Sequence, residues 1–214
     1  MKKLSIINEN IFDGIGKRSK SDSVRKENYV DQVDLGLPSG TIWATCNLGA
    51  SSPEEYGDYY AWGETEPKDY YDWDTYKFGT KDNLTKYNRE DRKIILDLED
   101  DAAHVVLGGK WHIPTREQIQ ELFDNTTNEE SELNDVKGRL FTSKINGNTL
   151  FFPYSGSKSN SSILGEGRWC LFWSSSIDIL YHYAITLYSY LKTSKFDCGY
   201  RCIGYSVRGV LDKK

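Results

Sequence analysis

The segment from 184 to 191 constrains the fold most, because its side chains alternate between two chemical kinds. Aliphatic residues alternate with threonine and tyrosine in the order Ile185, Thr186, Leu187, Tyr188, Tyr190 and Leu191. Successive side chains of a β-strand point to opposite faces of the sheet, so this period of two predicts a strand. We expect the aliphatic face to be buried and the tyrosine face to lie in solvent.

Tyrosine is concentrated in this part of the chain, with six of the 15 tyrosines between Tyr181 and Tyr205. The residues in and around this stretch that suit a fixed framework are Trp173–Ser176, Ala184, Leu187, Arg201, Gly204 and Ser206–Arg208. Tyrosine provides a large amphipathic contact area at a low cost in side-chain entropy. We therefore expect a ligand-binding surface that is formed by Asp178, Leu180, Tyr181, His182, Tyr183, Thr186, Tyr188, Tyr190, Asp197, Tyr200, Cys202, Ile203 and Tyr205.

Two helices are predicted in the middle of the chain. An apolar stripe with helical spacing runs from Ile94 to Val106 and ends at Gly108-Gly109. The second helix begins at Thr115, which forms a capping-box pattern with Gln118. Its expected buried face consists of Ile119, Leu122 and Phe123.

The remaining segments favour loops and antiparallel strands. The aromatic-rich stretch from 56 to 78 is interpreted as a long loop packed over the core, and 125 to 135 as a polar loop. Two strands at 139–143 and 149–153 flank Asn146-Gly147, which is a hairpin turn signal. A serine- and glycine-rich loop is expected from 155 to 167. Together these elements predict an α+β fold with two helices and a mainly antiparallel sheet.

Length and composition indicate one globular domain at 33–211, preceded by a flexible N-terminal tail at 1–32. This tail is too polar to bury much surface, and docking on a partner or a sister subunit is the alternative. Its start resembles a signal peptide, but the apolar run is short and is broken by Asn8 and Glu9. The protein is therefore expected to be cytoplasmic, carried by a phage, or exported with its leader removed.

Charge and residue chemistry argue against several function classes. The net charge is −5, no basic stretch alternates with aromatic residues, and no apolar run is long enough for a membrane span. The cysteines Cys46, Cys170, Cys198 and Cys202 have no second pair at metal-ligand spacing. We also find no nucleophile paired with a base, so we expect no catalytic residue, no metal and no cofactor.

Four ordered motifs carry a family resemblance, at Val33–Gly40, Trp43–Ala50, Tyr56–Glu64 and Gly108–Thr115. With the C-terminal framework, they are similar to the Fibrobacter succinogenes major paralogous domain family, which is common in Bacteroidetes. The resemblance implies a C-type-lectin-like fold that is related to the formylglycine-generating enzyme. One departure is Gly209, where relatives commonly have proline.

A subset of that family resembles the variable proteins of diversity-generating retroelements, in which adenines of a C-terminal repeat are rewritten. Asparagine codons then change to many residues, but never to Lys, Glu, Gln, Met or Trp. From Asp178 to Tyr205, only Lys192 and Lys195 fall outside the permitted set. The resemblance thus implies a hypervariable region at about 169–208, in a receptor for a protein or glycan on a cell or phage-host surface. The alternative is a carbohydrate-binding or surface-assembly module of fixed specificity.

Overall fold

The structure is a computed structural model, and it describes residues 30–213. It consists mostly of antiparallel β-sheets with two α-helices, which is the predicted α+β class. Most of the expected tail lies outside the described residues. No helix within 30–213 is long and apolar enough to cross a membrane.

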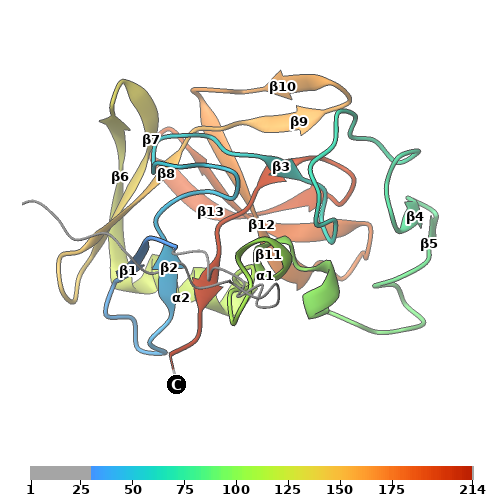
Figure 1. Cartoon of the computed structure of the whole chain (residues 1–214), viewed down its shortest axis with the longest axis horizontal. Coiled ribbons are helices and arrows are strands. Elements are labelled where there is room, and N and C mark those ends of the chain that lie inside the picture. The colour runs from blue at the N-terminus through green and yellow to red at the C-terminus, as the bar shows by residue number, and fades with distance from the viewer. Residues whose placement is uncertain (1–29, 214) are drawn as a thin grey trace, which may run out of the picture.

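The largest sheet has five strands in the order β13-β12-β11-β14-β3 (Figure 1). Its strands are β3 (Tyr59–Tyr60), β11 (Trp169–Ile177), β12 (Tyr183–Tyr190), β13 (Thr193–Tyr200) and β14 (Tyr205–Ser206). All neighbours are antiparallel except β11 and β14, which are parallel. β12 is the strand that the alternating segment predicts, and its start differs by one residue.

A second sheet is a three-stranded meander of β6 (Thr126–Leu133), β7 (Val136–Ser143) and β8 (Thr149–Pro153). The predicted hairpin is confirmed, with Gly147 in its turn at a φ of 77°. The prediction of a loop at 125–135 is wrong, because residues 126–133 of this polar segment form β6 and pair with β7. Asn134 and Asp135 form its turn at φ values of 49° and 66°, a conformation that Asn and Asp tolerate better than most residues.

A third sheet joins the two ends of the described chain. β2 (Ile42–Ala44) lies between β1 (Gln32–Asp34) and β15 (Val210–Leu211). Two small hairpins complete the strands: β4 (Gly79–Thr80) with β5 (Asn83–Leu84), and β9 (Ser157–Ser159) with β10 (Ser162–Leu164). The expected loop at 155–167 therefore contains a short hairpin.

The helices are α1 (Ala102–Leu107) and α2 (Arg116–Asn125), with a 3₁₀ turn, η1, at Leu98–Asp100. The capping box of α2 is confirmed: Thr115 Oγ1 accepts from the Gln118 N–H, and Gln118 Oε1 accepts from the Thr115 N–H. The first helix is shorter than predicted. Ile94 and Ile95 are extended instead, and the Ile94 carbonyl accepts from the Ile177 N–H at 2.9 Å.

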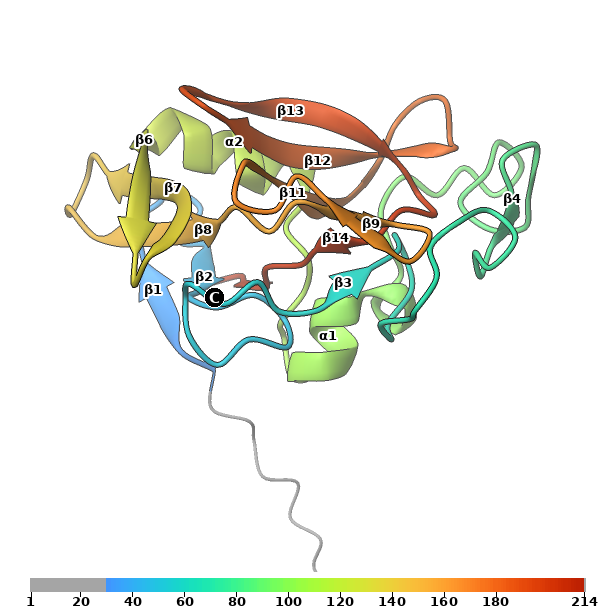
Figure 2. The ribbon, with the colours of Figure 1, turned by 90° about the horizontal axis from the view of Figure 1, so that it is seen from above.

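The core consists of two clusters of buried side chains. One lies between the main sheet and the aromatic segment, and it includes Trp62, Tyr76, Phe78, Tyr87 and Trp173. The expected packing of the 56–78 segment over the core is therefore confirmed. The other cluster lies between α2, the meander and the far face of the main sheet, and Figure 2 shows α2 beside these strands.

Two buried arginines hold the loops around these clusters. Arg201 Nη1 donates to the carbonyls of Tyr87 and Tyr181, both at 3.0 Å. Arg208 donates to Asn47 Oδ1 and to the Phe151 carbonyl, and burial lowers its pKa to about 9. The acceptors of both arginines are mainly backbone carbonyls and include no carboxylate, so these arginines close loops rather than pair with acids.

Candidate binding surface

The predicted surface residues do not form one continuous face. Three of them are buried, Ile203 packs half-buried against the core, and the others lie in three partly exposed areas around β12 and β13. The alternation of residue types along β12 predicts the face of the sheet to which each side chain points. It does not show which parts of that face are covered by other segments. The aromatic segment covers one face of β12 near Ala184, while the other end of the strand stays open.

Thr186, Cys202 and Tyr205 are buried, which corrects their assignment to the surface. The Tyr205 ring lies 4.4 Å from Trp173, between centroids. A Cβ added at Gly199 would lie 2.2 Å from Tyr205 Cε2, so Gly199 makes room for this ring. Cys202 belongs to the same core cluster, and burial raises the pKa of its thiol to about 12. Ile203 is half-buried and packs against this cluster.

The first of these areas is an aromatic cluster of four half-buried side chains, Tyr183, Tyr200, His182 and Trp73. Tyr183 and Tyr200 face each other across β12 and β13, with ring centroids 4.5 Å apart and planes at 21°. The hydrogen bond between the two phenols raises the pKa of Tyr183 and lowers that of Tyr200. Lys81 Nζ lies 5.3 Å from the Tyr200 ring centroid and lowers this pKa further.

A polar pocket adjoins the aromatic cluster, with a volume of about 460 Å³. Its walls are formed by Lys81, Asp82, Asn83, Leu84, Asn88, Arg89, Glu90, Leu180, Tyr181 and His182. The predicted residues Leu180, Tyr181 and His182 thus form one wall, and charged or amide side chains of the 81–90 segment form the other. This second wall was missed by the sequence analysis, since nothing in that segment distinguishes it from an ordinary polar loop.

The second exposed area is an apolar groove that we call the isoleucine groove. It has a volume of about 300 Å³ and is lined by Ile94, Ile95, Arg116, Glu117, Ser176, Ile177, Asp178, Ile179, Tyr181 and Ile185. Ile179 is 83% exposed and Ile94 63%, which is unusual for side chains that gather at one place. A neighbouring pocket extends this groove along β13 to Phe196 and Cys198.

Only Asp178 and Tyr181 of this groove were predicted from the sequence. Ile94 and Ile95 were assigned to the apolar face of a helix, and this assignment is wrong. The Cys198 thiol donates to Asp178 Oδ2 at 3.7 Å. Burial, followed by the Asp178 charge, raises the pKa of Cys198 to about 11. The thiol therefore stays protonated at neutral pH.

The third exposed area, the sheet face, lies at the open end of β12 and β13. Tyr188 and Tyr190 stack with centroids 6.4 Å apart, and Trp169 meets Tyr190 edge-on at the same distance. Lys195 Nζ lies 5.6 Å from the Tyr188 ring centroid. Asp197, two residues further along β13, is exposed. Aromatic residues are enriched in protein recognition surfaces.

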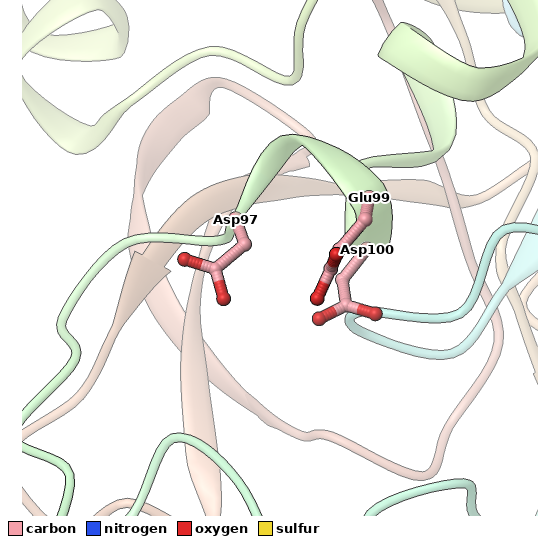
Figure 3. Close-up of side chains that lie close together, drawn as sticks. All are labelled: Asp97, Glu99 and Asp100. Atoms are coloured by element: carbon pink, nitrogen blue, oxygen red, sulfur yellow. The ribbon is translucent and has the colours of Figure 1, made fainter.

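One group of carboxylates is close enough to share a metal ion among residues 30–213: Asp97, Glu99 and Asp100 (Figure 3). Lys86 Nζ lies 2.7, 2.9 and 2.5 Å from their oxygens, so an ammonium group already occupies the space between them. Hydrogen bonds from Lys86 and Lys93 lower the pKa of Asp97. This arrangement is an ion-pair network that ties the 86–93 segment to η1.

We expect this network to make the folding stability of the protein decrease at acidic pH. Because the folded-state pKa of Asp97 is lowered, its contribution is present above the ordinary Asp pKa of about 3.9 and is lost as the pH falls through the lower folded value. Thermal melts from about pH 6 to about pH 2 should show a steeper loss for the wild type than for Lys86→Met. Equal slopes for the two proteins would contradict this assignment.

Thr186 offers a second test, because its buried Oγ1 has no hydrogen-bond partner within the described part of the chain. A buried hydroxyl without a partner costs about 1–3 kcal/mol. Thr186→Val should therefore raise the free energy of unfolding by about 1 kcal/mol in urea titrations. Thr186→Ser, which keeps the hydroxyl and removes the methyl group, should lower it. A loss in both variants would mean that the hydroxyl is bonded in solution.

Comparisons with known proteins found no relative. No protein-family model, no curated protein and no solved structure matches this chain. The family resemblance of the sequence motifs therefore remains a prediction, and the function has to be argued from the exposed areas around β12 and β13.

Proposed function

We propose that this protein is a non-enzymatic ligand-binding protein with a C-type-lectin-like fold. It would be the variable protein of a diversity-generating retroelement, and its ligand a protein or glycan on a cell or phage-host surface. The observation that carries this proposal is the arrangement of partly exposed aromatic side chains on β12 and β13, with exposed isoleucines beside them, on a sheet whose other strands are fixed by the core. A rigid sheet allows exposed side chains to change without loss of the fold.

The chemistry of the exposed areas supports binding of a protein ligand in particular. Ile179, Ile94 and Ile95 form an apolar patch beside Arg116 and Asp178. Such a patch with polar residues at its border is typical of protein interaction sites, where a few large side chains supply most of the affinity. Sugars present mostly hydroxyl groups, for which three isoleucines are poor partners.

Backbone strain at two turns is a further supporting observation. Tyr181 and Leu191 have φ values of 61° and 49°, a left-handed conformation in which Gly or Asn is preferred. Tyrosine and leucine are therefore not the residues that give the most stable backbone conformation at these turns. Replacement of asparagine codons, as the family resemblance implies, would explain why such residues stand at both positions.

The gene itself provides the decisive experiment. Sequencing the DNA around the 3′ end should reveal an imperfect repeat of the region that encodes about 169–208, different only at adenines, with a reverse transcriptase gene nearby. Such a repeat would establish diversification. If no repeat is present in the complete genome, the retroelement part of the proposal is wrong, and a fixed binding protein remains.

The strain at Leu191 can be tested directly on the protein. Leu191→Asn should raise the free energy of unfolding by about 0.5–1 kcal/mol, because asparagine adopts a positive φ at lower cost. Leu191→Ala is the matched control, since it removes the same exposed side chain but keeps the unfavourable conformation. Urea titrations should separate the two variants. An identical midpoint for both would show that the turn is not strained.

A glycan ligand is the second candidate, and the polar pocket beside the aromatic cluster favours it. The amide and charged groups of the pocket can hydrogen-bond to a sugar, and the half-buried rings beside it can stack on the sugar. Calorimetric titration with a panel of monosaccharides and oligosaccharides tests this candidate. Binding that is lost in Asn88→Ala and His182→Ala, but kept in Ile179→Asp, would identify the polar pocket as a saccharide site.

A further inference from the structure

The strand β13 forms one edge of the five-stranded sheet, and Figure 2 shows it along the top of the molecule. Among the residues that the structure describes, its sheet neighbour is β12 alone. An edge strand leaves one row of backbone N–H and C=O groups without a partner in the sheet. The Cys198 N–H belongs to this outer row, because it donates to the side chain of Asp197 at 2.9 Å. Amide groups alternate in direction along an antiparallel strand, so those of Ser194 and Phe196 also point outward.

The hairpin turn gives the same assignment. Tyr190 and Thr193 face each other in the ladder on either side of a two-residue turn. In such a hairpin the flanking pair exchanges its hydrogen bonds, and every second residue of the strand does so after it. Ser194, Phe196 and Cys198 lie between these bonded positions. Within 30–213, no backbone group of another segment bonds to any of the three.

Two opposite charges flank the centre of this edge. Lys195 and Asp197 are exposed and lie on the same face of β13. Neither takes part in an ion pair within the described part of the chain. Phe196, between them, points to the other face and packs against Phe123 of α2, with ring centroids 5.4 Å apart. The strand is thus held in place by the core, while its two charges face solvent.

We propose that two copies of this protein form a symmetric dimer through antiparallel pairing of their β13 strands, with Phe196 opposite Phe196 of the second copy. Lys195 then lies opposite Asp197 of the second copy, and the twofold axis repeats this pair. Opposite charges that face each other across antiparallel strands stabilise the pairing, whereas like charges destabilise it. A twofold contact uses the same surface on both copies, so the assembly closes at the dimer.

The charges select one register of this pairing. Only residues with outward-pointing amides can bond across the new ladder, so the strands can shift relative to each other only in steps of two residues. One step in one direction places Lys195 opposite Lys195, and one step in the other places Asp197 opposite Asp197. In the favoured register, the Cys198 N–H bonds to the Ser194 carbonyl of the second copy. The Asp197 carboxylate is then released to pair with Lys195.

The edge strand β6 lacks this complementarity. Like β13, it is eight residues long and lies at the edge of its sheet. It carries Glu129, Glu130 and Glu132 but no Lys or Arg, so two β6 strands would repel each other. Of the two eight-residue edge strands in 30–213, β13 is therefore the one that suits pairing with a second copy.

The dimer has a consequence for binding, although it does not depend on which ligand is bound. The main sheet would continue from one copy into the other, with the two sheet faces side by side. A ligand that is present in several copies on a surface would then be held at two points, which raises the apparent affinity. The proposal assigns Asp197 to the contact between copies rather than to the ligand.

Charge reversal tests the dimer by sedimentation velocity on the full chain from about 1 to about 300 μM, the range in which contacts with a micromolar Kd dissociate. The wild type should shift from monomer to dimer. Lys195→Asp and Asp197→Lys should each stay monomeric, because each places like charges opposite each other. An equimolar mixture of these two variants should dimerise, since each pair is then Lys opposite Asp. Lys137→Asp is the matched control, because it makes the same charge change at an exposed site of β7, and it should dimerise like the wild type.

A disulfide tests the register separately. Ser194 of one copy faces Cys198 of the other with Cα atoms about 5.5 Å apart, which a disulfide can span. Oxidised Ser194→Cys should therefore give a covalent dimer in which mass spectrometry finds a bond between positions 194 and 198. Within one copy these positions are about 13 Å apart along the strand, too far for this bond. Thr193→Cys is the control, since its side chain points to the other face, and it should give at least about tenfold less of the dimer.

Several results would overturn the proposal. These are a wild type that stays monomeric at the highest concentration, a dimer that persists in both charge variants, and a mixture of these variants that does not associate. Oxidised dimers of Ser194→Cys that are linked only through Cys198 of both copies would contradict the register. None of these results bears on the repeat in the gene, so the dimer can fail while the proposed function stands.

Discussion

Trp173→Ala should lower the free energy of unfolding by about 3–5 kcal/mol. The Trp173 side chain is 1% exposed, packs against Tyr205, and its Nε1 donates to the Tyr60 carbonyl at 2.7 Å. Its removal leaves a large cavity in the core cluster that supports the aromatic cluster, and it leaves a buried carbonyl without a donor. Urea titrations that follow tryptophan fluorescence and circular dichroism in parallel measure the effect.

Tyr190→Ser is the comparison for Trp173→Ala, because Tyr190 is 40% exposed at the end of β12. Exposed substitutions usually change stability by no more than about 0.5 kcal/mol. A clear difference between the two variants is expected if exposed positions can vary while buried ones are fixed. Losses of stability of similar size in the two variants would show that Tyr190 is part of the folded core in solution. The sheet face would then not be a binding area.

Arg201→Met should be destabilising by at least about 3 kcal/mol. Arg201 is fully buried, and its guanidinium donates to the Tyr76 hydroxyl and to the carbonyls of Lys86, Tyr87 and Tyr181. Methionine keeps much of the apolar volume but removes every one of these donors, and each buried acceptor left without a partner costs about 1–3 kcal/mol. Thermal and urea unfolding both report the loss.

Arg89→Met provides the control for Arg201→Met, since Arg89 is an exposed arginine in the same segment of loops. It should unfold like the wild type. The Arg201 variant should also lose the arrangement of the 181–183 turn, because the wild-type guanidinium holds this turn through its hydrogen bond to the Tyr181 carbonyl. Amide spectra in which this turn is unchanged would contradict the role assigned to Arg201.

Local signals in the sequence predicted the elements that short-range chemistry determines. The Asn146-Gly147 turn, the capping box of Thr115 and Gln118, and the alternation along β12 each depend on residues only a few positions apart. The structure confirms the turn, the capping box and the strand at β12. It does not confirm the burial expected along β12, since Thr186 is buried and Leu191 is 55% exposed. The strand at β6 was missed, because its polar side chains lack the apolar alternation of a half-buried strand and its partner, β7, supplies the pairing.

The binding surface was less predictable, because exposure depends on segments that are distant in the sequence. Tyr205 and Thr186 appeared to belong to an open tyrosine face. They are covered because the aromatic segment packs over that part of the sheet, where Tyr205 lies against Trp173. Conversely, Ile94 and Ile95 have the spacing of a buried helix face, but pairing with β11 holds them in an extended conformation at the surface. No periodicity within either segment contains this information.

The sheet that joins the ends of the described chain has a mechanical consequence. β1 and β15 are both antiparallel to β2, so they run parallel to each other on its two sides. A force that pulls residues 30 and 213 apart would slide β1 and β15 in opposite directions along β2, and the hydrogen bonds of both ladders would share the load. β12 and β13 belong to a different sheet and lie outside this path of force. A molecule tethered through its two ends would therefore keep its ligand-contacting strands in place under tension until the terminal sheet gives way.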